Sequence, residues 1–82
     1  KVANELLDID GVRASFVLSK IDNVVYVSAR SIDDVNVQVI MEHFGGGGHG
    51  TVAGAQIEDV SIDEVKQQIR DLIRKMRDDG DF

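Results

Sequence analysis

The chain has 82 residues, of which 43% are hydrophobic and 29% charged; its formal net charge is −6, and it contains neither cysteine nor proline. This length suits one domain with a single hydrophobic core, and the composition is that of an ordinary globular domain. The lack of cysteine excludes disulfides and thiolate metal ligands. The acidic charge argues against a broad basic surface for long nucleic acids, so any bound anion should be small and locally held.

No apolar run reaches the roughly 20 residues that cross a bilayer, and no signal peptide is visible. The chain begins at Lys1 rather than at a methionine. We therefore expect it to be a segment of a longer protein, with no membrane contact of its own.

The beginning of the chain has the apolar spacing of a short helix. Val2, Leu6 and Leu7 fall on one side of a helix over residues 1–10, and Gly11 can end it in a left-handed conformation. We therefore predict that the chain starts with a helix.

Two strands are predicted next, over residues 12–20 and 24–30, because apolar and polar residues alternate in both. The Asp-Asn pair at residues 22–23 suits a tight hairpin turn. In the second strand, Ser28 and Arg30 should share the face opposite the alternating apolar residues.

Residues 35–44 fit both a strand and a helix, because their apolar residues recur at a period of two and also at helical spacing. We choose a helix. Asn36 is a good N-cap, and the glycine run that begins at Gly45 supplies a C-terminal stop. A strand would leave both end signals unexplained.

The remaining elements are a third strand over residues 55–60, with room for about one helical turn in residues 49–54, and a long C-terminal helix. Ser61 and Glu64 form a capping box at the start of that helix. Basic residues suit its other end. The helix has an apolar side at spacings of three and four, made of Ile62, Val65, Ile69, Leu72, Ile73 and Met76.

The glycine run Gly45, Gly46, Gly47 and Gly48, followed by His49, is the first candidate for chemistry. Backbone N–H groups without β-carbons can converge on an anion, and a helix beginning after the run would add positive charge. His49 would then donate to a bound phosphate. The alternative is a flexible hinge with a solvated histidine, and composition alone leaves both open.

Arg30 is the second candidate, because it ends a strand beside Ser28 and Ser31 and can fork onto phosphate oxygens. Alternatively it pairs with one of the aspartates at 33 and 34. Asn36 is an N-cap candidate whose amide could equally reach a ribose or a base. His43 suits a surface position at a helix end, and no metal-ligand or catalytic-triad spacing can be proposed.

Taken together, the motifs resemble those of a known family. The string Ser28-Ala29-Arg30-Ser31, then Asn36-Val37, then residues 44–49 (FGGGGH) with Ala53-Gly54 beyond, is similar to the DHHA1 domain of DHH/DHHA1 phosphoesterases. The resemblance runs over residues 12–57 in the family's order and spacing, although Val52 replaces an alanine that is frequent there.

The resemblance implies that Gly46, Gly47, Gly48 and His49 form a substrate-binding loop, and that Arg30 with Ser28 and Ser31 holds a nucleotide phosphate. It also implies a separate DHH domain of the same protein that carries the catalytic metals, usually manganese. We therefore expect the isolated chain to be inactive in hydrolysis.

Within the family, the residues look most like cyclic-di-AMP phosphodiesterases of the GdpP type, whose domain of this kind is cytoplasmic in a membrane-anchored protein. Cyclic-di-AMP and its linear product pApA are then the expected ligands, with phosphodiesterases of very short RNA as the alternative. A noncatalytic nucleotide- or RNA-binding module is the rival from another class, and a homodimer stays open.

We expect an α+β fold in which a small mixed sheet, built on the hairpin, packs against the C-terminal helix. The glycine loop and Arg30 should lie close together, at an edge that faces the DHH domain.

Overall fold

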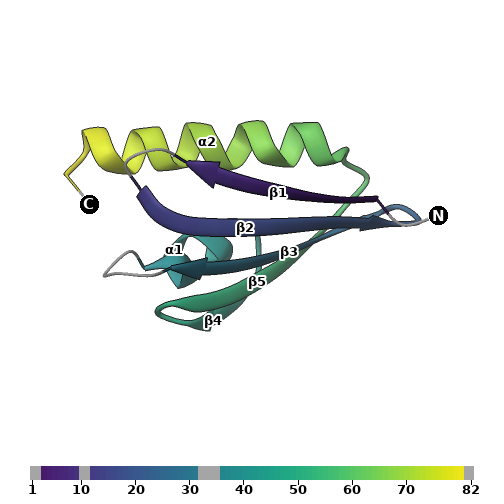
Figure 1. The fold of residues 1–82 in the computed structure, drawn as a ribbon, viewed down its shortest axis with the longest axis horizontal. Helices are drawn as coiled ribbons and strands as arrows, with labels where there is room; N and C mark the ends of the chain where they lie inside the picture. The colour runs from purple at the N-terminus through teal and green to yellow at the C-terminus, as the bar shows by residue number, and fades with distance from the viewer. Residues whose placement is uncertain (1–2, 10–11, 32–35, 81–82) are drawn as a thin grey trace.

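The computed structural model describes residues 3–9, 12–31 and 36–80 and contains five strands and two helices in the order β1, β2, β3, α1, β4, β5, α2. The strands form one sheet in the order β1-β2-β3-β5-β4 (Figure 1). The predicted α+β class is confirmed. Every described strand pair is antiparallel, so the sheet is antiparallel where a mixed sheet was expected.

The helix predicted at the start of the chain is wrong, because Ala3–Ile9 forms strand β1. It pairs with β2 from Ala3 opposite Lys20 onward. Leu7 is buried whereas Leu6 is 62% exposed, which is the period of a strand rather than of a helix. Pairing with β2 overrides the local helical spacing; residues 1–2 and 10–11, which include the expected stop at Gly11, lie outside the described residues.

The predicted hairpin is confirmed as β2 (Val12–Ile21) and β3 (Val24–Ser31). Asp22 in the two-residue turn has a φ of 55°, the left-handed conformation that aspartate tolerates in tight turns. Alternate residues of β3 are buried, so Ser28 and Arg30 share the exposed face as expected.

The choice of a helix after β3 is also confirmed. Helix α1 spans Val37–Glu42, and Asn36 is its N-cap. The helix ends at Glu42, with His43 as its C-cap. Gly45 lies beyond this cap; its φ of 81° would strain a residue with a side chain, and its N–H donates to the Glu42 carbonyl at 3.0 Å.

The segment after α1 differs from the sequence-based expectation. Gly47–His49 forms strand β4, residues 50–51 make a turn, and β5 runs over Val52–Glu58. The glycines thus lead into a hairpin rather than into a helix, and no helix N-terminus follows them. The third predicted strand exists, but it begins three residues earlier, because pairing with both β3 and β4 extends it.

Helix α2 spans Ile62–Asp78 and begins directly after Ser61, where the capping box predicts its start. Ser61 Oγ accepts from the Glu64 N–H at 3.1 Å and donates to Glu64 Oε1 at 3.4 Å, so Ser61 is confirmed as the N-cap of the predicted capping box. At the other end of the helix, Asp79 is the C-cap.

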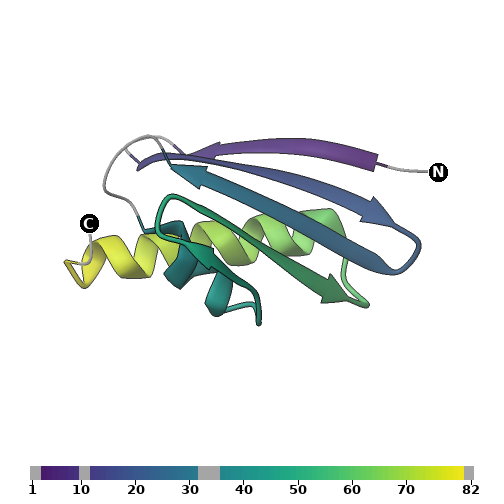
Figure 2. The same cartoon turned by 90° about the horizontal axis from the view of Figure 1, so that it is seen from below.

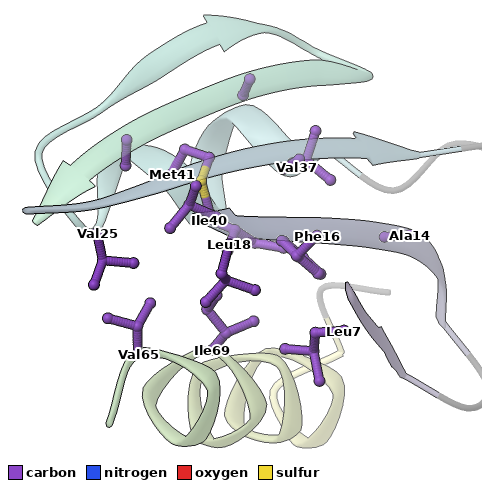
Figure 3. Close-up of a cluster of buried hydrophobic side chains, with 14 of the residues drawn as sticks. Leu7, Ala14, Phe16, Leu18, Val25, Val37, Ile40, Met41, Val65 and Ile69 are labelled. Carbon is purple, nitrogen blue, oxygen red and sulfur yellow. The ribbon is translucent and has the colours of Figure 1, made fainter. Parts of the chain in front are cut away.

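Both helices lie on the same face of the sheet (Figure 2). Between them and the sheet is one apolar core, part of which is drawn in Figure 3, where Phe16, Leu18 and Ile69 point toward one another. Lys66 of α2 also pairs with Glu5 of β1 at 2.8 Å. The opposite face has no described helix on it, and exposed apolar side chains occur there on four strands: Leu6, Val17, Ile21, Tyr26 and Val52.

Candidate functional site

A row of residues across the uncovered face of the sheet brings the two main candidate side chains together. Arg30 of β3 is opposite Val52 of β5, and Val52 is opposite His49 of β4. Directly opposed residues point to the same face of a sheet, so Arg30 and His49 both flank Val52. Two strand spacings separate them, about 10 Å, a gap that the long arginine side chain can partly span. All three residues are exposed.

Ser28 lies one row further along the same face, opposite Gly54, which is itself opposite Gly47. It lines two shallow depressions. One, of about 340 Å³, includes Arg30 and Val52. The other includes Tyr26 and Gly46. The side chains at residues 28, 47 and 54 are small or absent, so little projects above the backbone in this part of the face.

Ser31 is placed differently from the other members of the arginine motif. It is buried, on the helix-covered face, and its N–H donates to the Thr51 carbonyl at 2.9 Å. Its side chain thus does not share the exposed face with Arg30. The alternative pairing of Arg30 with an aspartate at 33 or 34 falls on residues outside the described ones.

Asn36 serves as a helix cap. Its Oδ1 accepts from the N–H groups of Gln38 at 3.0 Å and Val39 at 3.4 Å. The N-cap interpretation is therefore confirmed, and a contact of its amide nitrogen with a ligand stays a prediction.

The glycines of the run meet different surroundings. A β-carbon at Gly46 would lie 2.0 Å from the Gly54 carbonyl, and one at Gly48 would lie 2.4 Å from the Val52 carbonyl. These two glycines are required by the close approach of the segment to β5. Gly47 differs, because a β-carbon there would meet nothing within 4 Å and its φ is not in the left-handed region. The contacts of the described chain give no reason for glycine at position 47.

The turn after His49 is held by residues that the sequence analysis did not single out. Gly50 donates its N–H to Gln38 Oε1 at 3.2 Å and accepts from the Val37 N–H at 2.9 Å. A glutamine in the first turn of a helix is commonplace, so no signal in the sequence distinguishes Gln38.

Among the described residues, no group of three or more His, Asp or Glu side chains is placed to hold a metal ion. Neither described helix is both long and apolar enough to cross a membrane. The candidate surface in this part of the chain presents an arginine, a histidine, a serine and backbone without side chains.

A family model that describes the DHHA1 domain matches residues 1–77, so the chain belongs to the DHHA1 domain family. It is 53% identical over 81 residues to the cyclic-di-AMP phosphodiesterase GdpP of Geobacillus thermodenitrificans, covering 98% of this chain and 12% of that protein. It is 46% identical over 70 residues to the cyclic-di-AMP phosphodiesterase PdeA of Listeria monocytogenes, covering 84% of this chain and 11% of the relative.

A relative with a different name also matches. The A-adding tRNA nucleotidyltransferase of Aquifex aeolicus is 35% identical over 72 residues, covering 87% of this chain and 9% of that protein. The chain thus spans about a tenth of the length of the relatives it matches, and the same domain accompanies more than one named activity.

Proposed function

We propose that this chain is the substrate-binding domain of a phosphodiesterase that hydrolyses cyclic-di-AMP or a short oligonucleotide. The row Arg30, Val52, His49 on the uncovered face carries the proposal, since it presents two potential donors to one anion from neighbouring parts of the sheet. The names of two relatives, both cyclic-di-AMP phosphodiesterases, support an adenine dinucleotide as the ligand.

In this proposal each group has a separate role. Arg30 forks onto phosphate oxygens, and His49 donates a ring N–H to the same phosphate. Ser28 and the low backbone at Gly47 and Gly54 let the ligand approach the sheet closely. These contacts fix the ligand's position, which lowers the entropic part of a reaction barrier.

Bond cleavage is assigned to a DHH domain of the same protein. A divalent metal such as manganese would be held there, since the described residues of this chain offer no ligand set. The metal would activate water, and this chain would position the phosphate. The cytoplasm is the proposed compartment of both domains.

The test is a titration followed by backbone amide NMR, without divalent metal, using cyclic-di-AMP and, separately, pApA. We expect saturable shifts centred on Arg30 and residues 47–49. The absence of shifts with both ligands at millimolar concentration, or shifts confined to the helix-covered face, would contradict a nucleotide site on this surface. Loss of hydrolysis in the whole protein on Arg30→Ala or His49→Ala would link the site to the reaction.

A second candidate, a noncatalytic RNA-binding module, is favoured by the tRNA nucleotidyltransferase relative. In that case, hydrolysis by the whole protein should survive both substitutions, and RNA rather than cyclic-di-AMP should shift the amides.

A further inference from the structure

The turn between β4 and β5 is tied to α1 through both backbone groups of one residue. The Gly50 N–H donates to Gln38 Oε1 at 3.2 Å, and its carbonyl accepts from the Val37 N–H at 2.9 Å. The next carbonyl, of Thr51, accepts from the Ser31 N–H at 2.9 Å. The residue after His49 is thus bonded to the helix, and the one after that to the end of β3.

The side-chain amide of Gln38 is itself oriented. Its Nε2 donates to Glu42 Oε2, one helical turn away, at 3.4 Å. Because an amide has its donor and its acceptor on opposite branches, this contact leaves the Gln38 carbonyl oxygen available to Gly50. Glu42, Gln38 and Gly50 form a short polar chain from the helix to the turn.

Strand β4 has little else to hold it. It consists of two glycines and His49, and among the described strands β5 is its one neighbour in the sheet. Glycine contributes no side-chain packing and disfavours regular strands. A β-carbon at Gly50 would meet nothing within 4 Å, so packing does not fix the turn either. At the other end, the Gly46 N–H donates to the Met41 carbonyl at 2.9 Å. Helix α1 therefore holds the segment on both sides of β4.

We propose that Gln38 is a positioning residue for nucleotide binding, which through Gly50 keeps His49 opposite Val52 and in the same row as Arg30. The inference rests on the proposed function and adds to it a residue that does not touch the ligand. Without the Gln38 bond, the turn keeps one of its two contacts with α1, and His49 samples positions away from the row.

The first measurement is amide hydrogen exchange in the 82-residue chain carrying Gln38→Ala. We expect the protection of the Gly50 amide to fall about two- to tenfold, the effect of losing one neutral hydrogen bond. Protection of the Met41 amide should not change, which separates a loosened turn from an unfolded helix.

Gln67→Ala is the matched control. Gln67 also donates to a carboxylate one turn away, Asp71 Oδ1 at 2.9 Å, but its printed contact stays within α2. It should leave Gly50 exchange unchanged. Equal exchange at Gly50 in the wild type and in Gln38→Ala would overturn the role of Gln38.

A second variant restores the contact. Gln38→Glu combined with Glu42→Gln keeps the net charge, and the carboxylate at position 38 can accept from both Gly50 and the new amide at position 42. We expect near wild-type exchange at Gly50. Gln38→Glu alone should be worse than the double variant, because like charges one turn apart repel.

Binding is then compared by titrating cyclic-di-AMP and pApA into each variant. We expect Gln38→Ala to weaken binding about two- to tenfold, Gln67→Ala to have no effect, and the double variant to recover affinity. If Gln38→Ala exchanges faster at Gly50 but binds with unchanged affinity, Gln38 holds the turn, and its proposed role in positioning His49 for binding is overturned. No binding to the wild-type chain would overturn the proposed function, while the exchange data still decide whether Gln38 holds the turn.

Discussion

Gly47 and Gly48 differ in what an added side chain would meet. Because of this difference, substitutions at the two positions can separate an effect on folding from an effect on ligand binding. At Gly48 a β-carbon would run into the Val52 carbonyl and Ala53 of β5. At Gly47 it would enter open space, in the part of the face where Gly54 and Ser28 have no side chain or a small one. A requirement for glycine at position 47 would therefore come from a ligand.

We predict that Gly47→Ala changes the free energy of unfolding by about 1 kcal/mol or less, whereas Gly48→Ala destabilises by more than that because backbone must move. Gly47→Ala should nonetheless weaken nucleotide binding. Urea unfolding and ligand titration of both variants measure the two effects. Unchanged ligand affinity in Gly47→Ala would show that the position is not part of the binding surface.

For Arg30 we predict a loss of binding without a loss of stability. Arg30→Ala removes an exposed side chain, so the free energy of unfolding should change by about 0.5 kcal/mol or less. A charge-assisted hydrogen bond to phosphate contributes roughly 1.5–3 kcal/mol, so affinity should fall about ten- to a hundredfold. Arg30→Lys should recover only part of it, since an ammonium cannot bind two oxygens with fixed geometry.

Arg70 on the exposed side of α2 supplies the control. Arg70→Ala makes the same change of net charge far along the chain from the row. If it weakened binding as much as Arg30→Ala, the effect would be one of overall charge, and the proposed contact of Arg30 would be wrong.

The candidate residues were recognisable in the sequence, but their spatial relation was not. Arg30 and His49 are 19 positions apart, and they approach because β5 enters the sheet between β3 and β4. Nothing local encodes that strand order. Gln38 was missed for the same reason, since its partner Gly50 is 12 positions away.

Among the elements, β1 shows most clearly that pairing with another strand can override the local sequence pattern. A helix would place Leu6 and Leu7 on one buried side, whereas the strand buries Leu7 at 2% exposure and exposes Leu6. The β2–β3 hairpin and α2 could be predicted because their periodicity and end signals are strong over many residues. Strand β1 and the three-residue β4 depend on partners elsewhere in the sheet, so their own residues do not determine them.

Because residues 3–9 form a strand rather than a helix, substitutions at Leu6 and Leu7 should have different effects on stability. Leu7→Ala should destabilise by about 2–5 kcal/mol, as for other buried leucines, and Leu6→Ala by about 0.5 kcal/mol or less. Because a small domain can unfold under the larger change, Leu7→Val, expected near 1 kcal/mol, keeps the comparison measurable. Equal effects at the two positions, measured by urea unfolding, would contradict β1.

At the scale of the whole molecule, the net charge of −6 restricts the ligands. The basic side chain in the proposed row is that of Arg30, and His49 is a second donor, so one or two phosphates should be contacted. The net negative charge of the chain repels further phosphates, which favours short ligands over long ones.

We predict that the logarithm of the affinity for pApA falls with the logarithm of salt concentration with a slope between about −0.7 and −1.4, the value for one or two single-strand phosphates. A single-stranded RNA of 20 nucleotides should bind no more tightly per site than pApA. Titrations from 50 to 200 mM salt measure both quantities. A slope several times steeper, with tighter binding of the long RNA, would instead favour the RNA-binding module.

The insertion of β5 between β3 and β4 also determines when the site can exist. No partly folded chain that lacks β5 can bring Arg30 and His49 to either side of Val52, so binding selects the fully paired sheet. A ligand that contacts both side chains then joins two strands, β3 and β4, across β5, and its binding free energy is added to the stability of the fold. At a hundred times the dissociation constant this amounts to about 2.7 kcal/mol. In this small domain the nucleotide would act as a removable cross-link across the edge of the sheet.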